Sequence, residues 1–159
     1  SPGSPDEEQK LYDLSYRLDD ELKSEKYDNA AAVALELLKQ AECCRNNWDY
    51  GNAVHHGHVA LGRYALSQGK VDDAKRHLLE AAKTQGSPQL NSFGPDRVLA
   101  NQLLQQGERD AVIKYLEECA RFWKHGDRPV REIEFWITKI KAGKTPNLTE
   151  FVYFGDSNE

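Results

Sequence analysis

Apolar residues recur every three or four positions along most of the chain. The first stripe consists of Leu11, Leu14, Leu18 and Leu22, a spacing that places them on one face of an α-helix. Six more stripes with helical spacing follow: Val33, Leu37, Leu38 and Ala41; Val54, Leu61 and Ala65; Val71, Ala74, Leu78 and Ala81; Val98, Leu99 and Leu103; Val112, Leu116, Cys119 and Trp123; and Val130, Ile133, Ile137 and Ile140. No segment alternates with period two for long enough to make a β-sheet. The pattern predicts an all-α fold.

Glycine and proline mark where several of these helices begin or end. Gly69, Gly86 and Gly107 follow three of the stripes, and Pro95 precedes another, as proline does in the first turn of a helix. Helices joined by two or three residues must lie antiparallel. We therefore expect about three antiparallel helix pairs, stacked as a short α-solenoid, followed by a capping helix over residues 130–142.

The remaining segments set the expected domain boundaries. Residues 1–8 consist mostly of serine, proline, glycine and acidic residues, so they predict a disordered leader. Residues 9–146 are expected to form a single helical-repeat domain, and residues 147–159 a tail. The aromatic side chains of the tail either fold back onto the last helix, which we favour, or present a strand to a partner. These side chains are Phe151, Tyr153 and Phe154.

Two of the predicted pairs share one internal spacing. The series in the first of them is Leu61-Gly62, Ala65, Gly69, Ala74, Leu78 and Ala81, and the series in the next is Leu99-Ala100, Leu103, Gly107, Val112, Leu116 and Cys119. Small residues fall where two helices must approach closely. This pattern over residues 52–124 resembles the tetratricopeptide repeat, and residues 11–44 match it more loosely. The stretch from NNWDYGNAVHHGH through GSPQLNSFGP, residues 46–95, is also similar to a group of uncharacterised bacterial tetratricopeptide-like proteins.

The resemblance implies a function in protein or peptide binding. In the family, the first helix of each pair lines a concave groove, and the corresponding positions here are His56, Val59, Arg63, Leu66, Arg97, Asn101 and Leu104. Arg63, Arg97 and Asn101 would supply donors to a carboxylate. We therefore expect a partner that is acidic or carries a free C-terminal carboxylate. The alternative is that these are ordinary solvated surface residues.

The two long junctions between repeats suggest a second candidate site. Trp48 and Tyr50 of residues 46–52 could form one wall of a pocket, opposite a wall from residues 86–95. The residues of the opposite wall would be Asn91, Ser92 and Phe93. The alternative, which we favour, is that Trp48 and Phe93 plug a gap between irregularly stacked repeats.

Three histidines, His55, His56 and His58, fall within four positions. His58 shares the apolar stripe of Val54 and Leu61, so we expect it to be a core residue. The alternative is a metal-dependent enzyme or sensor built around His55 and His58 together with the segments 46–52 and 86–95. A metal needs three or four converging ligands, and His56 lies on the other side of the helix. We therefore expect no metal and no cofactor.

The overall composition narrows the class of protein further. No phosphate loop, dinucleotide fingerprint or nucleophile elbow occurs, which favours a non-enzymatic function. The net charge is −5, and all of this acidic excess lies in residues 1–28, so that residues 29–159 balance at zero. No basic stripe is present to bind nucleic acid. No apolar run approaches the ~20 residues that membrane insertion needs. Three cysteines do not make a disulfide framework, which favours a cytoplasmic location. Because the sequence has no initial Met, an N-terminal signal that was removed stays as an alternative.

Overall fold

The computed structural model of the chain describes residues 1–150 and 152–154. The elements run in the order α1 (Pro5–Lys23), α2 (Tyr27–Ala41), the 3₁₀ turn η1 (Glu42–Cys44), α3 (Tyr50–Ser67), α4 (Val71–Ala82), α5 (Pro88–Phe93), α6 (Val98–Gln105), α7 (Arg109–Cys119) and α8 (Arg128–Lys141). No strand occurs among residues 1–150 and 152–154, so the predicted all-α class is confirmed. None of these helices is both long and apolar enough to cross a bilayer.

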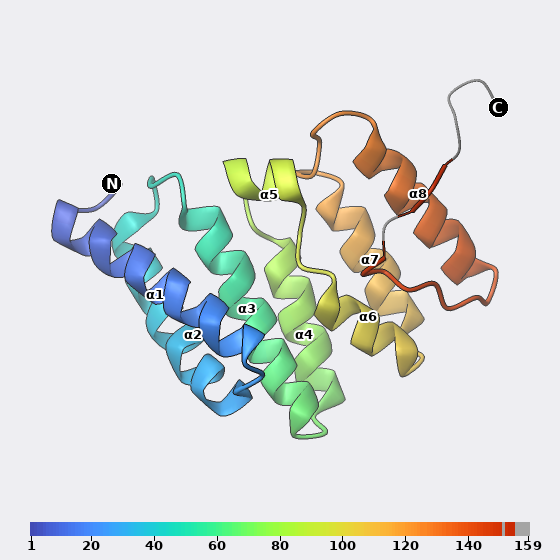
Figure 1. The fold of residues 1–159 in the computed structure, drawn as a ribbon, viewed down its shortest axis with the longest axis horizontal. Helices are drawn as coiled ribbons and strands as arrows, with labels where there is room; N and C mark the ends of the chain where they lie inside the picture. The colour runs from blue at the N-terminus through green and yellow to red at the C-terminus, as the bar shows by residue number, and fades with distance from the viewer. Residues whose placement is uncertain (151, 155–159) are drawn as a thin grey trace.

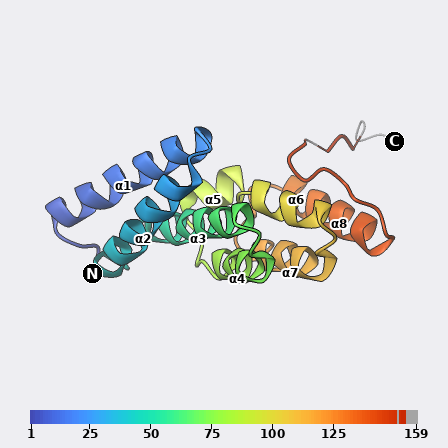
Figure 2. The same cartoon turned by 90° about the horizontal axis from the view of Figure 1, so that it is seen from below.

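The helices pack mainly in chain order, which gives an elongated molecule with α1 and α2 at one end and α8 at the other (Figure 1). α3 is the central element, since it packs against α2 and α4 and also contacts α1 and α6. α4 and α7 lie side by side along one edge, and α6 lies next to α7 (Figure 2). α1 and α6 therefore contact the part of the α3 surface that α2 and α4 leave uncovered.

The turns after α1, α3 and α6 have the same hydrogen-bond pattern. At each turn one residue has a positive φ: 56° at Glu25, 74° at Gly69 and 85° at Gly107. The N–H of the following residue donates to a carbonyl five residues back, as in Lys26 to Glu21, Lys70 to Ala65 and Glu108 to Leu103. This is the Schellman arrangement, which satisfies the last carbonyls of the helix and reverses the chain. Gly69 and Gly107 predict two of these turns from the sequence. The first turn was not predicted, because Glu25 stands where the other two have glycine.

Two clusters of buried apolar residues make up the core. The stripe of leucines on α1 packs against α2 and part of α3. The larger cluster joins α3 to α8 and includes Leu148 and Val152 beyond the last helix. Several residues predicted to be core positions are less buried than expected. Val130 is exposed, and Leu38, Val54, Leu61 and Ile137 are only partly buried.

The N-terminus differs from the expected disordered leader of residues 1–8. The Ser4 hydroxyl accepts a hydrogen bond from the Glu7 N–H at 3.2 Å, and the Glu7 carboxylate accepts one from the Ser4 N–H at 2.9 Å. This capping box, with Pro5 in the first turn, starts α1 at Pro5, inside the segment that was expected to be disordered.

The segment 86–95 also differs from the expected loop, because residues 88–93 form α5. Ser87 caps this short helix by accepting from the Leu90 N–H at 3.1 Å, and Leu90 is buried. The next helix, α6, begins at Val98 and not directly after Pro95. A helix of six residues is too short to produce a periodic apolar stripe, which explains why the pattern did not reveal it.

Part of the tail packs onto the domain. Leu148 is fully buried, and its N–H donates to Asn101 Oδ1 at 3.0 Å. Phe154 lies edge-on to Phe135 of α8, with ring centroids 6.2 Å apart. Tyr153 is exposed, and Phe151 lies outside the described residues.

Candidate functional site

Small residues allow neighbouring helices to approach α3 closely. A Cβ at Gly62 would overlap Leu99 Cδ2 of α6, and a Cβ at Gly57 would lie 2.8 Å from Leu38 of α2. The expected close contact at Gly62 is therefore present. Because helices approach α3 from several sides, its surface cannot be divided into one buried and one exposed half.

His55, and not His58, is the fully buried histidine of the cluster. Its Nε2 accepts a hydrogen bond from the Asp96 N–H at 2.9 Å, so Nδ1 carries the proton and donates to the Ala81 carbonyl at 3.1 Å. Burial lowers the pKa of His55 to about 3, which keeps the ring neutral. Both nitrogens already have main-chain partners, so His55 has no free nitrogen to offer a metal.

His58 is half-buried and pairs with a histidine of α4. The His58 and His77 rings stack 5.4 Å apart, and their Nδ1 atoms lie 3.2 Å from each other. The prediction that His58 is a core residue is therefore wrong. The helical spacing gives the direction of the side chain, but it does not show that α4 leaves this side of α3 partly exposed. Among the residues that the structure describes, no three His, Cys, Asp or Glu side chains gather as a metal site.

The residues predicted to line a carboxylate-binding groove separate into four groups. Val59 and Leu104 are 0% and 1% exposed and belong to the core, so they cannot contact a partner. Arg97 lies over the rings of Trp123 and Trp136, with its guanidinium carbon 5.4 and 5.6 Å from their centroids. Arg97 is not among the residues that line the pocket shared by Arg63, Leu66 and Asn101.

Arg63, Leu66 and Asn101 do come together, at a surface pocket of about 370 Å³ between α3 and α6. Its other lining residues are Tyr27, Ser67, Gln102, Gln105 and Gln106. Arg63 Nη2 donates to the Tyr27 hydroxyl at 3.3 Å, and the guanidinium carbon lies 5.2 Å from the Tyr27 ring centroid. Arg63 Nε is buried and has no hydrogen-bond partner among the described residues. We refer to this site as the Arg63 pocket.

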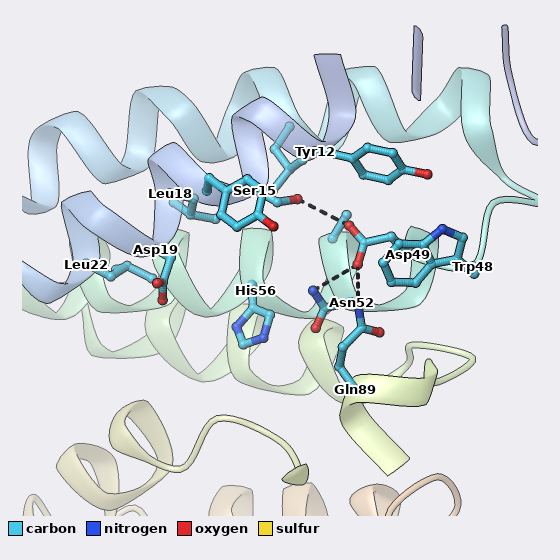
Figure 3. Close-up of a pocket in the computed structure, with 13 residues that line it drawn as sticks. Tyr12, Ser15, Leu18, Asp19, Leu22, Trp48, Asp49, Asn52, His56 and Gln89 are labelled. Carbon is cyan, nitrogen blue, oxygen red and sulfur yellow. Dashed lines mark hydrogen bonds between the residues drawn. The ribbon is translucent and has the colours of Figure 1, made fainter. Parts of the chain in front are cut away.

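His56, the remaining groove candidate, lines a different pocket of about 240 Å³ between α1 and α3 (Figure 3). The other residues lining this pocket are Tyr12, Ser15, Tyr16, Leu18, Asp19, Leu22, Leu37, Trp48, Asp49, Asn52, Ala53 and Gln89. We refer to it as the Asp49 pocket. Burial lowers the pKa of His56, and the charges of Asp96, Asp19 and Asp49 oppose this shift.

Asp49 is the most buried polar residue of this pocket, with 4% of its surface exposed. Its carboxylate accepts hydrogen bonds from Gln89 Nε2 at 3.0 Å, Asn52 Nδ2 at 3.2 Å and Ser15 Oγ at 3.5 Å (Figure 3). Burial raises the pKa of Asp49, and these three hydrogen bonds partly offset the rise. All three donors are neutral groups.

Of the five residues predicted to form a two-walled loop pocket, Trp48 lines the Asp49 pocket and the other four do not. Tyr50 packs partly buried against the α1–α2 core, and Asn91 Oδ1 accepts from the Lys124 N–H at 3.1 Å. Ser92 and Phe93 are exposed and do not line the pocket. The favoured alternative, that Trp48 and Phe93 plug a gap, is also wrong, because they are 56% and 81% exposed.

Sequence reasoning missed most of the residues that line the Asp49 pocket. Tyr12, Tyr16 and Asp19 recur at helical spacing on α1, next to the leucine stripe, and this second stripe was a usable signal. Asp49 and Gln89 gave no such signal, because both lie in short segments that join the main helices. No family model, curated protein or solved structure matches the chain.

Proposed function

We propose that this chain is a non-enzymatic, tetratricopeptide-like scaffold that binds a protein or peptide on the face formed by α1, α3 and α6. Three helix pairs with equivalent Schellman turns at Glu25, Gly69 and Gly107 support the repeat. The Asp49 pocket lies between α1 and α3, and the Arg63 pocket lies between α3 and α6. Both pockets therefore involve the first helices of the pairs, which line the groove in that family.

The buried, unpartnered Nε of Arg63 is the observation that carries this proposal. A buried donor without an acceptor costs about 1–3 kcal/mol, and a ligand carboxylate would remove that cost. The Arg63 pocket is otherwise lined by amide, hydroxyl and apolar groups, and no carboxylate is among its lining residues. The partner therefore presents an acidic side chain or a free C-terminal carboxylate at this pocket.

A random peptide library displayed with free C-termini would test the proposal. We expect the selected peptides to share an acidic residue or to depend on the terminal carboxylate, and to lose affinity when that group is amidated. Arg63→Gln should weaken these peptides at least tenfold, as expected for a charge-assisted hydrogen bond. Arg76→Gln on α4 removes the same charge from an exposed side chain and is the matched control. Selected peptides that bind Arg63→Gln as tightly as the unmodified protein would contradict the proposal.

A metal-dependent enzyme or sensor around His55 and His58 remains the alternative function. It has less support, because the two nitrogens of His55 are bound to the Asp96 N–H and the Ala81 carbonyl. A zinc or iron content of one atom per chain that falls in the His55→Ala/His58→Ala double variant would favour this alternative.

A further inference from the structure

We propose that the Asp49 pocket is a binding site for a primary ammonium group carried on an alkyl chain. The site lies between α1 and α3, and its ligand has the opposite charge to the one proposed for the Arg63 pocket. The inference rests on the pocket's own residues and does not depend on whether Arg63 binds a carboxylate.

The charge of the pocket is the first argument. Asp19 of α1 and Asp49 before α3 face the pocket, and no lysine or arginine is among the residues that line it. Asp19 forms an ion pair with Lys23 at 2.8 Å, but both side chains are largely exposed there. His56 is the one basic group among the described residues of the wall, and burial holds its pKa below the usual range, so it is neutral near pH 7. The pocket therefore has a net negative charge.

The second argument is that Asp49 is buried without a cation. Its hydrogen bonds come from Gln89, Asn52 and Ser15, and no ion pair with a described lysine or arginine accompanies them. A buried carboxylate without a counter-charge is costly, and a ligand cation reduces that cost. Oδ1 accepts the two shorter hydrogen bonds, whereas Oδ2 accepts only the long one from Ser15. Oδ2 therefore has capacity for a ligand N–H.

Gln89 adds an unused acceptor to the same wall. Its Nε2 donates to Asp49, which leaves Oε1 as the other end of the amide. This atom is buried and has no hydrogen-bond partner in the part of the chain that the structure describes. An ammonium group has three N–H donors and no acceptor, so it satisfies oxygen atoms without introducing a new unpaired group. Asp49 Oδ2 and Gln89 Oε1 are the two acceptors that we assign to the ligand.

The aromatic residues of the pocket suit a cation with an apolar stem. The rings of Tyr12 and Trp48 lie 5.7 Å apart, and Trp48 is 56% exposed (Figure 3). Such rings attract an ammonium group through their π faces. Leu18, Leu22 and Leu37 line the same space and favour methylene groups. A volume of about 240 Å³ accommodates one amino-alkyl chain, and it is below the range of typical drug-sized ligand sites.

Titration of the full chain by ¹H–¹⁵N NMR tests this proposal, because the three tryptophan indole N–H groups report separately. The probes are Nα-acetyl-lysine N-methylamide for a lysine side chain, glycine N-methylamide for a peptide N-terminus, and cadaverine for a free amine. Nα-acetyl-norleucine N-methylamide is the uncharged control. We expect saturable shifts of the Trp48 resonance with at least one amine and none with the norleucine probe. The resonances of Trp123 and Trp136, which lie in the other core cluster, should not move.

Asp49→Asn keeps the shape of the side chain and removes its charge, so it should weaken amine binding at least tenfold. Asp20→Asn makes the same charge change at an exposed site of α1 and should leave binding unchanged. If Asp49→Asn is less stable, Asp19→Asn provides the second test and should weaken binding at least threefold. Absence of saturable Trp48 shifts with all three amines, or equal binding by Asp49→Asn and the unmodified protein, overturns the proposal. The ranking of the three probes then distinguishes a peptide from a free amine as the source of the ammonium group.

Discussion

The imidazole Nε2 of His55 accepts a hydrogen bond from the main-chain N–H of Asp96 at 2.9 Å. With Nδ1 bound to the Ala81 carbonyl, the neutral ring connects α3 to the end of α4 and to the segment before α6. A protonated ring would direct its Nε2–H at the Asp96 N–H, inside a region that excludes water. The connection therefore requires His55 to be uncharged.

We expect the stability of the protein to fall on acidification below pH 6.5. An unfolded His55 binds a proton near its ordinary pKa of about 6.5, whereas the pKa of the folded His55 is lowered to about 3. Between these values protons bind preferentially to the unfolded state, so the free energy of unfolding decreases as the pH falls, by up to about 1.4 kcal/mol per pH unit. Urea unfolding at pH 7.5, 6.5 and 5.5 measures this dependence.

His55→Gln is the control for that dependence, because an amide does not titrate. The variant should be less stable at pH 7.5, since one amide cannot replace both hydrogen bonds of the ring. Between pH 6.5 and 5.5 it should lose less stability than the unmodified protein. Equal slopes for the two proteins would assign the acid sensitivity to carboxyl groups instead of His55.

Glu25→Gly should stabilise the protein by about 0.5–1 kcal/mol. Glu25 is exposed and has a φ of 56°, a left-handed conformation that costs a residue with a Cβ roughly 1–2 kcal/mol. Part of the gain is lost to the greater freedom of glycine in the unfolded chain. Gly69→Ala places a Cβ in the equivalent turn and should destabilise by a similar amount. Chemical unfolding of both variants checks the pair, and a loss of stability in Glu25→Gly would show that the three turns are not equivalent.

Gly62→Leu should destabilise the protein by about 1–3 kcal/mol, because even a Cβ at this position overlaps Leu99 of α6. Gly57→Ala is the comparison, since its Cβ would meet only the side chain of Leu38, which is partly exposed and can move. Its better helix propensity should then leave stability nearly unchanged. A thermal melt of each variant distinguishes the two sites. Equal losses at both positions would contradict the different mobility assigned to their neighbours.

Amine binding at the Asp49 pocket should weaken as the pH is lowered. Burial raises the pKa of Asp49, so this carboxylate becomes neutral at a higher pH than an ordinary aspartate. Protonation of His56 at low pH adds a positive charge to the wall and acts in the same direction. NMR titrations with the lysine probe from pH 7.5 to 4.5 should show affinity falling up to tenfold per pH unit at the acid end. Affinity that rises on acidification would exclude Asp49 as the counter-charge.

The Asp49 and Arg63 pockets should together favour peptides with both charges. His56 and Arg63 are seven residues apart on α3, which places them on one face about 10 Å apart. A short peptide carrying a lysine and an aspartate at matching separation should bind more tightly than peptides with either residue alone. Calorimetry on Asp49→Asn, Arg63→Gln and the double variant measures the coupling. If each single variant leaves the two-charge peptide unaffected, the two pockets do not share a ligand.

The helices other than α5, and two of the turns, could be predicted from local sequence alone. A leucine stripe such as Leu11 to Leu22 needs only the period of the α-helix, and Gly69 and Gly107 identify turns because few other residues adopt a positive φ readily. The lack of a Cβ at Gly62 likewise predicts a close helix–helix contact, even before the contacting helix is known. These features depend on residues within a few positions of each other, so the sequence contains them directly.

Tertiary packing decided the features that depend on what surrounds α3. The sequence could not show whether His55 or His58 is buried, because their partners on α4 and at Asp96 lie 19 to 41 residues away along the chain. The Asp49 pocket arises in the same way, since α1, α3 and α5 each supply one part of its wall. A helical wheel describes the directions in which side chains point. The burial, the pKa and the hydrogen-bond partners of those side chains depend on the neighbouring helices that exclude water from them.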